Sequence, residues 1–240
     1  MKHQSPHGNV SFFWKIADAL SRCFTSVRNN GIKKTMENIA VVLEDLWFDK
    51  SFGLETSRWV ELDALNIQSE NKDFGVLYEP TRVRAFRKMM DRIVLPKGRV
   101  FVDFGCGKGR ILCAAAAYSF RRIVGVEFAP ELCDICRRNI MSFKAKTRSD
   151  INIMVVEADA AEYKIKRDEN VFFFSNPFQK SVMEAVMANI YSSMNVNPRN
   201  ALLIIGNPEG LAPVVDAFPA FKKIMTYTYG SSSFYIYSNW

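Results

Sequence analysis

The sequence predicts an α/β fold built on a three-layer, doubly wound and mostly parallel seven-stranded sheet. From residue 99 onward, apolar segments of strand length alternate with helical patterns, which is typical of parallel strands joined by helical crossovers. The last two strand patterns are separated only by Gly230-Ser231-Ser232, which predicts a C-terminal antiparallel hairpin. We therefore divide the chain into a helical N-terminal extension over residues 1–80 and an α/β domain over residues 81–240.

The N-terminal extension contains two predicted amphipathic helices within residues 11–48, separated by the stop-and-turn signal Asn29-Asn30-Gly31. Each helix has one apolar face, because apolar residues recur every three or four positions. We expect both faces to pack onto the α/β domain, with the extension acting as a lid. A membrane-surface role for the first helix is the less favoured alternative. The apolar face of the second helix consists of Ile32, Met36, Ile39, Ala40, Leu43, Leu46 and Trp47.

Within the α/β domain, each strand is predicted from a short apolar run and each helix from a longer amphipathic stretch. A loop-rich connector over residues 49–80 leads into the domain. The predicted strands are 99–104, 122–127, 151–157, 171–175, 201–206, 223–229 and 233–238, and the predicted helices are 81–93, 111–118, 130–144 and 182–194.

The composition is that of a folded protein. Of the 240 residues, 48% are hydrophobic and 19 are Phe, which supports a sizeable core and argues against disorder. No stretch approaches the roughly 20 apolar residues that a membrane-spanning helix needs. The five cysteines form an odd number, so we expect reduced thiols and a cytoplasmic location.

The net charge is +7, and residues 96–150 hold most of the excess, with 11 basic and 5 acidic residues. A basic face of this kind attracts an acidic or polyanionic partner. The alternative is that solvated Lys and Arg side chains simply cover one surface. Nucleic acid is a less favoured partner, because no aromatic residues are interleaved with the basic ones.

The most informative segment is Asp103-Phe-Gly105-Cys-Gly107-Lys-Gly109-Arg110, which follows the first predicted strand and opens a helix. Glycines let the backbone turn sharply and approach a ligand, and the N–H groups at the helix start favour a negative ligand group. In open α/β sheets such a loop lies at the carboxyl edge, where ligands bind. The spacing differs from the G-x-G-x-x-G fingerprint of dinucleotide-binding proteins, which argues against a dehydrogenase.

Acidic residues also follow the next two strands. Glu127 ends the second strand, where a carboxylate can accept hydrogen bonds from both hydroxyls of a ribose. The alternative is that Glu127 pairs with a nearby arginine. Asp159 follows the third strand. Acids at three successive strand ends are a more specific signal than any one of them.

The D-x-G-x-G-x-G loop and these acids resemble the cofactor site of class I, Rossmann-like S-adenosylmethionine-dependent methyltransferases. The resemblance implies S-adenosylmethionine as the cofactor, held by a loop that Gly105, Gly107 and Gly109 shape. It implies that Asp103 anchors the loop near the methionine end and that Glu127 holds the ribose. It also implies that Asp159 accepts a hydrogen bond from the adenine amino group, while the N–H of Ala160 meets a ring nitrogen.

The fourth predicted strand ends in Ser175-Asn176-Pro177-Phe178, which resembles the [D/N]-P-P-[Y/F] motif of methyltransferases that modify nitrogen atoms. The resemblance implies that Asn176, Pro177 and Phe178 position the acceptor, with Asn176 accepting a hydrogen bond from the target nitrogen. Orientation would supply most of the rate gain, because the sulfonium is already a good leaving group. The second proline of the motif is missing and Phe178 stands one place early. The alternative is therefore a turn built from Asn and Pro.

A second resemblance covers residues 45–210 loosely. Tyr78-Glu79-Pro80-Thr81, just before the first helix of the domain, is similar in layout to the loop of non-SET histone-lysine methyltransferases. This implies that Tyr78, Glu79 and Thr81 border the methionine moiety. The alternative is that Pro80 and Thr81 only begin a helix.

We expect no metal site. Cys133 and Cys136 have C-x-x-C spacing, but they lie within a predicted helix without a second pair or a nearby histidine to complete a zinc site. The predicted function is methyl transfer from S-adenosylmethionine to a nitrogen of an unidentified acceptor, with a protein or other macromolecule slightly favoured. Two alternatives stay open: a small metabolite as acceptor, and a non-catalytic module that binds a polyanionic partner through its basic face.

Overall fold

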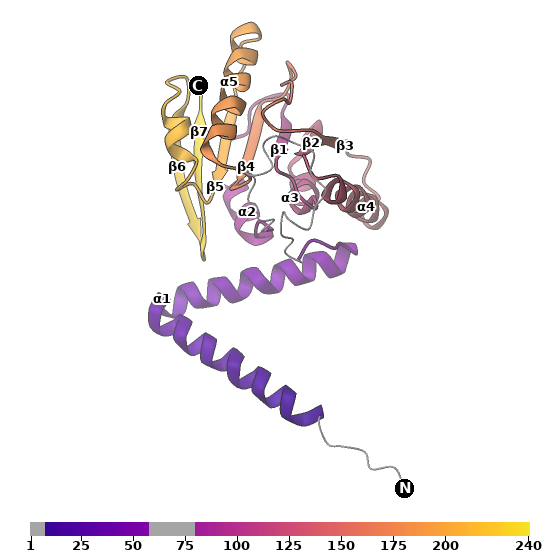
Figure 1. Ribbon diagram of the computed structural model, residues 1–240, viewed down its shortest axis with the longest axis vertical. Helices are drawn as coiled ribbons and strands as arrows, with labels where there is room; N and C mark the ends of the chain where they lie inside the picture. The colour runs from indigo at the N-terminus through magenta and orange to yellow at the C-terminus, as the bar shows by residue number, and fades with distance from the viewer. Residues whose placement is uncertain (1–7, 58–79) are drawn as a thin grey trace.

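The computed structural model describes residues 8–57 and 80–240, with the side chains of the first helix described mainly from residue 31 onward. Figure 1 shows the elements in the predicted order. The helices are α1 (Gly8–Phe52), α2 (Val83–Met90), α3 (Arg110–Ala115) with a 3-10 turn (Ala116–Tyr118), α4 (Pro130–Thr147), α5 (Lys180–Val196) and α6 (Ala212–Asp216). The strands are β1 (Val100–Phe104), β2 (Arg122–Glu127), β3 (Ile153–Glu157), β4 (Val171–Ser175), β5 (Leu202–Gly206), β6 (Lys222–Tyr229) and β7 (Ser232–Ser238). Helix α6 was not predicted from the sequence pattern.

The strands form a seven-stranded sheet in the order β3-β2-β1-β4-β5-β7-β6. Strands β1 to β5 pair in parallel, and β7 pairs antiparallel with both β5 and β6. The predicted fold class and the C-terminal hairpin are confirmed. Because β1 lies between β2 and β4, the strand order reverses there. In open sheets, ligands bind beyond the carboxyl ends of the strands at such a point.

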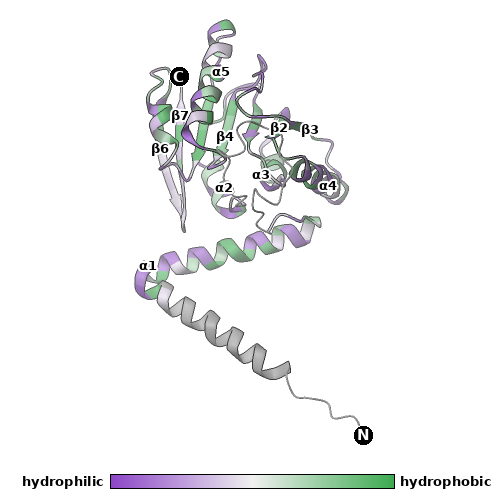
Figure 2. Ribbon diagram, viewed as in Figure 1, coloured by the Kyte–Doolittle hydropathy of each residue, from purple (hydrophilic) through white to green (hydrophobic). Residues whose placement is uncertain are grey.

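Helices cover both faces of the sheet, which gives three layers (Figure 1). Side chains of α2, α3 and α4 form one apolar cluster with one face of the strands, including Phe101 and Phe173. Side chains of α5 and α6 form the other cluster with the opposite face, including Phe104 and Phe174. Figure 2 shows the hydrophobic strands enclosed between these layers. Burial on both faces explains why the strands appear in the sequence as continuous apolar runs.

Helix α1 is broken at Gly31, whose φ of 77° and ψ of 162° lie outside the helical region. The predicted turn signal at Asn29-Asn30-Gly31 therefore marks a real kink, and the two arms of α1 form a V (Figure 1). The C-terminal arm, residues 32–52, lies against the α/β domain through Phe48, which is fully buried. Among the described residues, no helix combines the length and hydropathy needed to cross a bilayer.

The prediction that the apolar face of the second helix packs onto the domain is wrong. Met36, Leu43 and Trp47 are 61%, 60% and 59% exposed. The buried face instead carries Val41, Asp45, Phe48 and Asp49. The physical reason is that this face holds carboxylates with arginine partners on the domain, as described below.

Candidate active site

Apart from Thr81, which precedes α2, the predicted site residues with described side chains lie at the carboxyl ends of β1 to β4. The turn after β1 begins with two backbone hydrogen bonds, in which the N–H groups of Gly105 and Cys106 donate to the carbonyl of Val126 at 2.8 and 3.1 Å. The chain then passes through Gly107 and Gly109, both at positive φ, and enters α3. The loop therefore folds back over the end of β2, next to Glu127.

Glu127 is almost fully buried and is held by the backbone. Its carboxylate accepts hydrogen bonds from the N–H groups of Gly107 (2.9 Å), Phe128 (3.0 Å) and Ala129 (3.0 Å). Burial raises the pKa of Glu127, and these three bonds oppose that rise. Within the described residues Glu127 forms no ion pair, so the alternative of an arginine partner finds no support there. A carboxylate offers about four acceptor positions, which leaves room here for a ligand hydroxyl.

Asp103, at the C-terminal part of β1, is 4% exposed, and its carboxylate accepts no hydrogen bond from the described residues. Burial and the nearby charge of Glu127 raise its pKa well above the ordinary value for aspartate. A buried carboxylate without a hydrogen-bond donor is unfavourable unless a cation or a donor meets it. The glycine loop therefore lies beside a buried carboxyl group whose charged form a cationic ligand group would stabilise.

Asp159 and Ala160 form the start of the turn after β3, and both are half-buried. One oxygen of the Asp159 carboxylate accepts a hydrogen bond from the N–H of Ala161 at 2.8 Å. The N–H of Ala158 donates to the carbonyl of Glu127 at 2.9 Å, which joins this turn to the end of β2. Glu127 and Asp159 thus lie on the same edge of the sheet, where this hydrogen bond joins their two segments.

The Asn176-Pro177-Phe178 segment after β4 separates into three different environments. Asn176 has a positive φ of 50° and is exposed. Pro177 lies against the glycine loop, since a Cβ added to Gly105 would come within 2.3 Å of the Cβ of Pro177. Phe178 is 7% exposed and packs edge-on against Phe174 in the core. The structure therefore places the ring of Phe178 in the core, away from the position that the motif implied.

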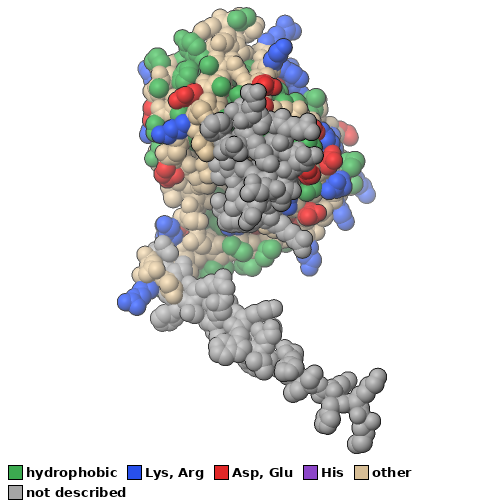
Figure 3. All heavy atoms as spheres, in the orientation of Figure 1, with side chains coloured by type: hydrophobic (Ala, Val, Ile, Leu, Met, Phe, Trp, Pro, Cys, Tyr) green, Lys and Arg blue, Asp and Glu red, His purple; other side chains and the backbone are tan. Residues whose placement is uncertain are grey.

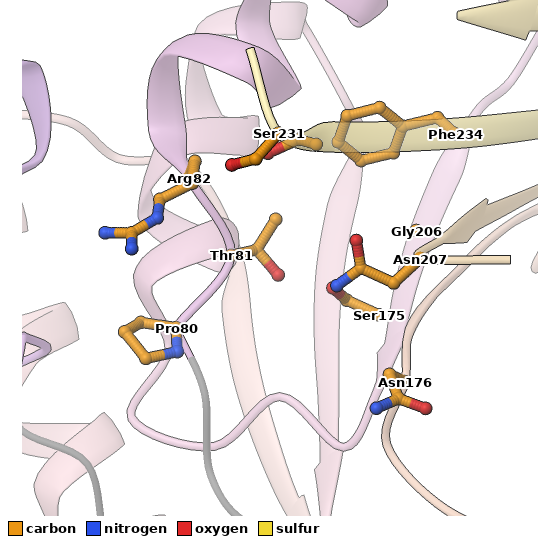
Figure 4. A pocket seen from close by; sticks show the side chains of 10 residues that line it. Pro80, Thr81, Arg82, Ser175, Asn176, Gly206, Asn207, Ser231 and Phe234 are labelled. Carbon is orange, nitrogen blue, oxygen red and sulfur yellow. The ribbon is translucent and has the colours of Figure 1, made fainter. Parts of the chain in front are cut away.

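A pocket of about 100 Å³ opens between the ends of β4 and β5, the start of α2 and the β6–β7 turn. In Figure 4 the amide of Asn207 points toward Thr81 across this pocket, while the guanidinium of Arg82 points away from it. The predicted residues Asn176 and Thr81 therefore line the same pocket. Its lining residues are Pro80, Thr81, Arg82, Ser175, Asn176, Gly206, Asn207, Ser231, Ser232 and Phe234.

Asn207 is a pocket residue that the sequence analysis missed. It follows β5 as Asn176 follows β4, each asparagine has a φ of 50°, and each precedes a proline. The repeated Asn-Pro after two neighbouring strands was the available signal. Its backbone N–H donates to the carbonyl of Ser233 at 2.9 Å, which fixes the turn. Two amide side chains thus stand at adjacent strand ends.

Arg110, at the start of α3, ties the glycine loop to the N-terminal extension. Its guanidinium is 2% exposed and forms ion pairs with Asp45 (3.2 Å) and Asp49 (3.1 Å) of α1. It also donates to the hydroxyls of Thr56 and Ser57 at 2.6 and 2.9 Å. The predicted loop residues Tyr78 and Glu79 lie outside the described residues.

The cysteine pair of α4 is buried at Cys133 and Cys136. Across residues 8–57 and 80–240, as far as their side chains are described, no group of three or more His, Cys, Asp and Glu residues is arranged to hold a metal ion.

Comparison with known proteins finds similarity over the central part of the chain. Residues 101–196 match a family model described as a methyltransferase domain. An RNA methyltransferase from Salinibacter ruber, solved with S-adenosyl-L-homocysteine, has a TM-score of 0.50 and 18% identity, covering 67% of this chain and 93% of that one.

Two further solved structures are similar at lower scores. The PH0226 protein from Pyrococcus horikoshii OT3 has a TM-score of 0.49 and 14% identity, with 74% and 95% coverage. A ribosomal protein L11 methylase from Lactobacillus delbrueckii subsp. bulgaricus has a TM-score of 0.47 and 14% identity, with 64% and 75% coverage. The comparison with curated protein sequences finds no match.

Proposed function

We propose that this chain, which carries a class I methyltransferase domain with S-adenosylmethionine as its cofactor, methylates a nitrogen atom of a macromolecular acceptor. The observation that carries the proposal is the contact between Gly105 and Pro177. This contact joins the glycine loop to the pocket that Asn176 and Asn207 line, so that the two form one continuous site at the carboxyl edge of the sheet.

The residues of the cofactor side fit S-adenosylmethionine. When bound, this cofactor supplies a methyl group on a sulfonium, which is a good leaving group. Glu127 has acceptor capacity left for one ribose hydroxyl, and Asp159 is the proposed partner of the adenine amino group. The buried carboxylate of Asp103 would stabilise the cationic methionine end, and that end would in turn offset its unfavourable burial.

On the acceptor side, we assign orientation to Asn176 together with Asn207. Amide oxygens accept hydrogen bonds from an amino or amide nitrogen, and two of them at adjacent strand ends fix the direction of its lone pair. Pro177 would position the loop rather than contact the acceptor, because it packs on Gly105. Phe178 has a core role in this proposal.

The small volume of the pocket beside Pro80, where the described residues resume after position 57, is consistent with a macromolecular acceptor. Sites for whole small molecules usually have volumes of about 300–1,000 Å³. The present pocket, at about 100 Å³, suits a single side chain or exocyclic amine presented by a larger partner. We assign the enzyme to the general class of S-adenosylmethionine-dependent methyltransferases (EC 2.1.1.-). The four described cysteines are free thiols, which supports the cytoplasm as its compartment.

The alternative of a non-catalytic module with a basic face has less support. Lys108 and Arg110 are buried, and Arg121, Arg122 and Arg137 form ion pairs with acidic residues. Much of the charge surplus of residues 96–150 is therefore unavailable to a polyanion. A smaller exposed group, Arg138, Lys146 and Arg148, remains for an acidic partner.

The test compares Glu127→Ala with Asn176→Ala. Calorimetric titration with S-adenosylmethionine, using NAD as the control ligand, measures cofactor binding. Transfer of a tritiated methyl group to the protein and nucleic-acid fractions of a cell extract measures turnover. We expect Glu127→Ala to weaken binding at least about tenfold, which corresponds to the loss of roughly 1.4 kcal/mol. We expect Asn176→Ala to abolish turnover while it leaves binding nearly unchanged.

Asn197→Ala, at the exposed C-terminal end of α5, is the matched control and should change neither measurement. Binding of NAD in place of S-adenosylmethionine, or the same defect pattern in the Glu127 and Asn176 variants, would refute the proposed roles.

A further inference from the structure

The C-terminal arm of α1 presents an unusual exposed apolar surface. We define the α1 apolar face as Ile32, Met36, Ile39, Val42, Leu43, Leu46 and Trp47, which are 40–72% exposed. Their spacing of one, three and four residues places them along one side of the helix. Figure 3 shows hydrophobic side chains gathered at the edge of the domain where this arm lies. Contiguous apolar surface of this kind marks an interaction site.

The acidic residues of the same arm all turn toward the domain. Glu37 accepts a hydrogen bond from the N–H of Gly230 at 3.1 Å, and Glu44 pairs with Arg84 and Arg87 at 3.0 and 3.3 Å. Asp45 and Asp49 pair with Arg110. Within residues 32–50 the remaining charged residues are Lys33, Lys34 and Lys50, and all three are exposed. The outward surface of the arm therefore consists of apolar side chains and lysines, and all of its charges are positive.

We propose that the α1 apolar face docks on an anionic lipid bilayer, with the helix lying in the plane of the membrane surface. Apolar side chains that include a tryptophan, next to lysines, are typical of helices that insert into the boundary between headgroups and acyl chains. The lysines flank the apolar face at both ends. There they would meet the phosphate groups of the lipids and the carboxylates of phosphatidylserine headgroups. The cytoplasmic leaflet supplies the negative surface that this charge pattern requires.

A second copy of the chain is a poorer occupant of this face. If two α1 arms packed face to face in antiparallel fashion, Lys33 and Lys34 of one would meet Lys50 of the other. A parallel pair would bring identical lysines together. In either arrangement the face has no exposed acid to compensate the repulsion, and like charges brought together across an interface oppose association.

The test uses the full chain and sedimentation with vesicles of phosphatidylcholine alone or with about 30% phosphatidylserine. We expect the chain to sediment with the anionic vesicles and to be released as salt is added. Each lysine near an anionic surface contributes about 1 kcal/mol, or roughly fivefold in partitioning. The triple variant Lys33→Glu/Lys34→Glu/Lys50→Glu should therefore lose at least about 100-fold.

The apolar contribution is tested with Leu43→Glu/Leu46→Glu. Its matched control is Val94→Glu/Val196→Glu, which changes two apolar residues that are 81% and 79% exposed elsewhere. We expect the first variant to lose vesicle binding and the control to keep it. Calorimetric titration of every variant with S-adenosylmethionine tests whether its fold is intact. This measurement is independent of vesicle binding.

Three outcomes would overturn the proposal. The first is wild-type chain that binds cofactor and does not sediment with anionic vesicles. The second is equal loss of vesicle binding in the control variant. The third is a dimer, measured by analytical ultracentrifugation without lipid, that Leu43→Glu/Leu46→Glu dissociates. That last result would assign the face to a second copy of the chain.

Discussion

Gly105 and Pro177 are in direct contact across the ends of β1 and β4. Gly105 has a φ of 73°, and a side chain there would place its Cβ 2.3 Å from the Cβ of Pro177. The glycine is therefore required twice, once by the left-handed backbone and once by the neighbouring proline. The loop proposed to hold the cofactor therefore packs directly on the segment proposed to hold the acceptor.

Gly105→Ala tests this contact. Gly98→Ala is the matched control, because Gly98 also has a positive φ of 60° but faces open space. The control should be destabilised by about 1–2 kcal/mol, the cost of the left-handed conformation alone. Gly105→Ala should be destabilised by a further 1–3 kcal/mol, roughly the cost of overpacking. Urea unfolding measures both, and equal losses would show that Pro177 does not restrict residue 105.

Asp103→Asn should stabilise the fold and weaken cofactor binding. The amide removes a buried acid that lies close to the carboxylate of Glu127, so we expect a higher unfolding free energy at neutral pH. Thermal unfolding and calorimetric titration with S-adenosylmethionine measure the two effects. Asp91→Asn, at the C-terminal end of α2, is a control outside the site.

The pH dependence of the same variant has a defined sign. Because the pKa of Asp103 is raised in the folded protein, folding favours its protonated form. The associated stability is present below the ordinary aspartate pKa and is lost as pH rises through the raised value. The advantage of Asp103→Asn should therefore be small below about pH 4 and grow with pH. An advantage that shrank as pH rose would contradict the assignment.

Arg110→Met should be strongly destabilising. The change leaves Asp49 buried without its arginine partner and leaves Asp45 with Arg82 alone, and breaking a buried ion pair from one side costs about 3–5 kcal/mol. Arg137→Met is the control, since Arg137 is 43% exposed and pairs with exposed acids, and it should cost less than about 1 kcal/mol. Denaturant unfolding followed by circular dichroism gives both values.

Asn207→Gly isolates the amide of Asn207, because glycine adopts the same positive φ without strain. Turnover should fall at least about tenfold, as expected for the loss of one orienting hydrogen bond, while cofactor binding stays unchanged. Ser119→Gly, which also replaces a residue with a φ of 50°, is the control far from the pocket. Unchanged turnover in Asn207→Gly would remove this residue from the acceptor site.

The sequence predicted the sheet well because its strands are buried on both faces and separated by clear helical patterns. β2 and β4 begin and end at their predicted residues. The orientation of α1 was predicted wrongly for a physical reason. Periodicity identifies two faces of a helix, but it does not tell which face is buried when the polar face carries acids that find buried arginines. Asp45 with Arg110, 65 positions apart, is such a pair.

The site was predicted less completely than the sheet. Glu127 and Asp103 follow from strand ends and a glycine loop, which are local signals. The separation of Phe178 from the pocket depends on how α5 packs against β4, and the position of Asn207 beside Asn176 depends on the pairing of β5 with β4. Both relationships depend on contacts between segments that are distant in the sequence, so a local pattern does not predict them.

The position of Arg110 has a consequence for how the two ends of the molecule influence one another. Arg110 is covalently part of the segment that leaves the glycine loop, and its charge is neutralised by α1. A ligand that bound the loop only in its ordered form would therefore favour packing of the α1 arm against the domain. By thermodynamic reciprocity, packing of that arm would strengthen the ligand's affinity by the same factor. Ligand binding at the glycine loop would thus shift the equilibrium between packed and released forms of the α1 arm.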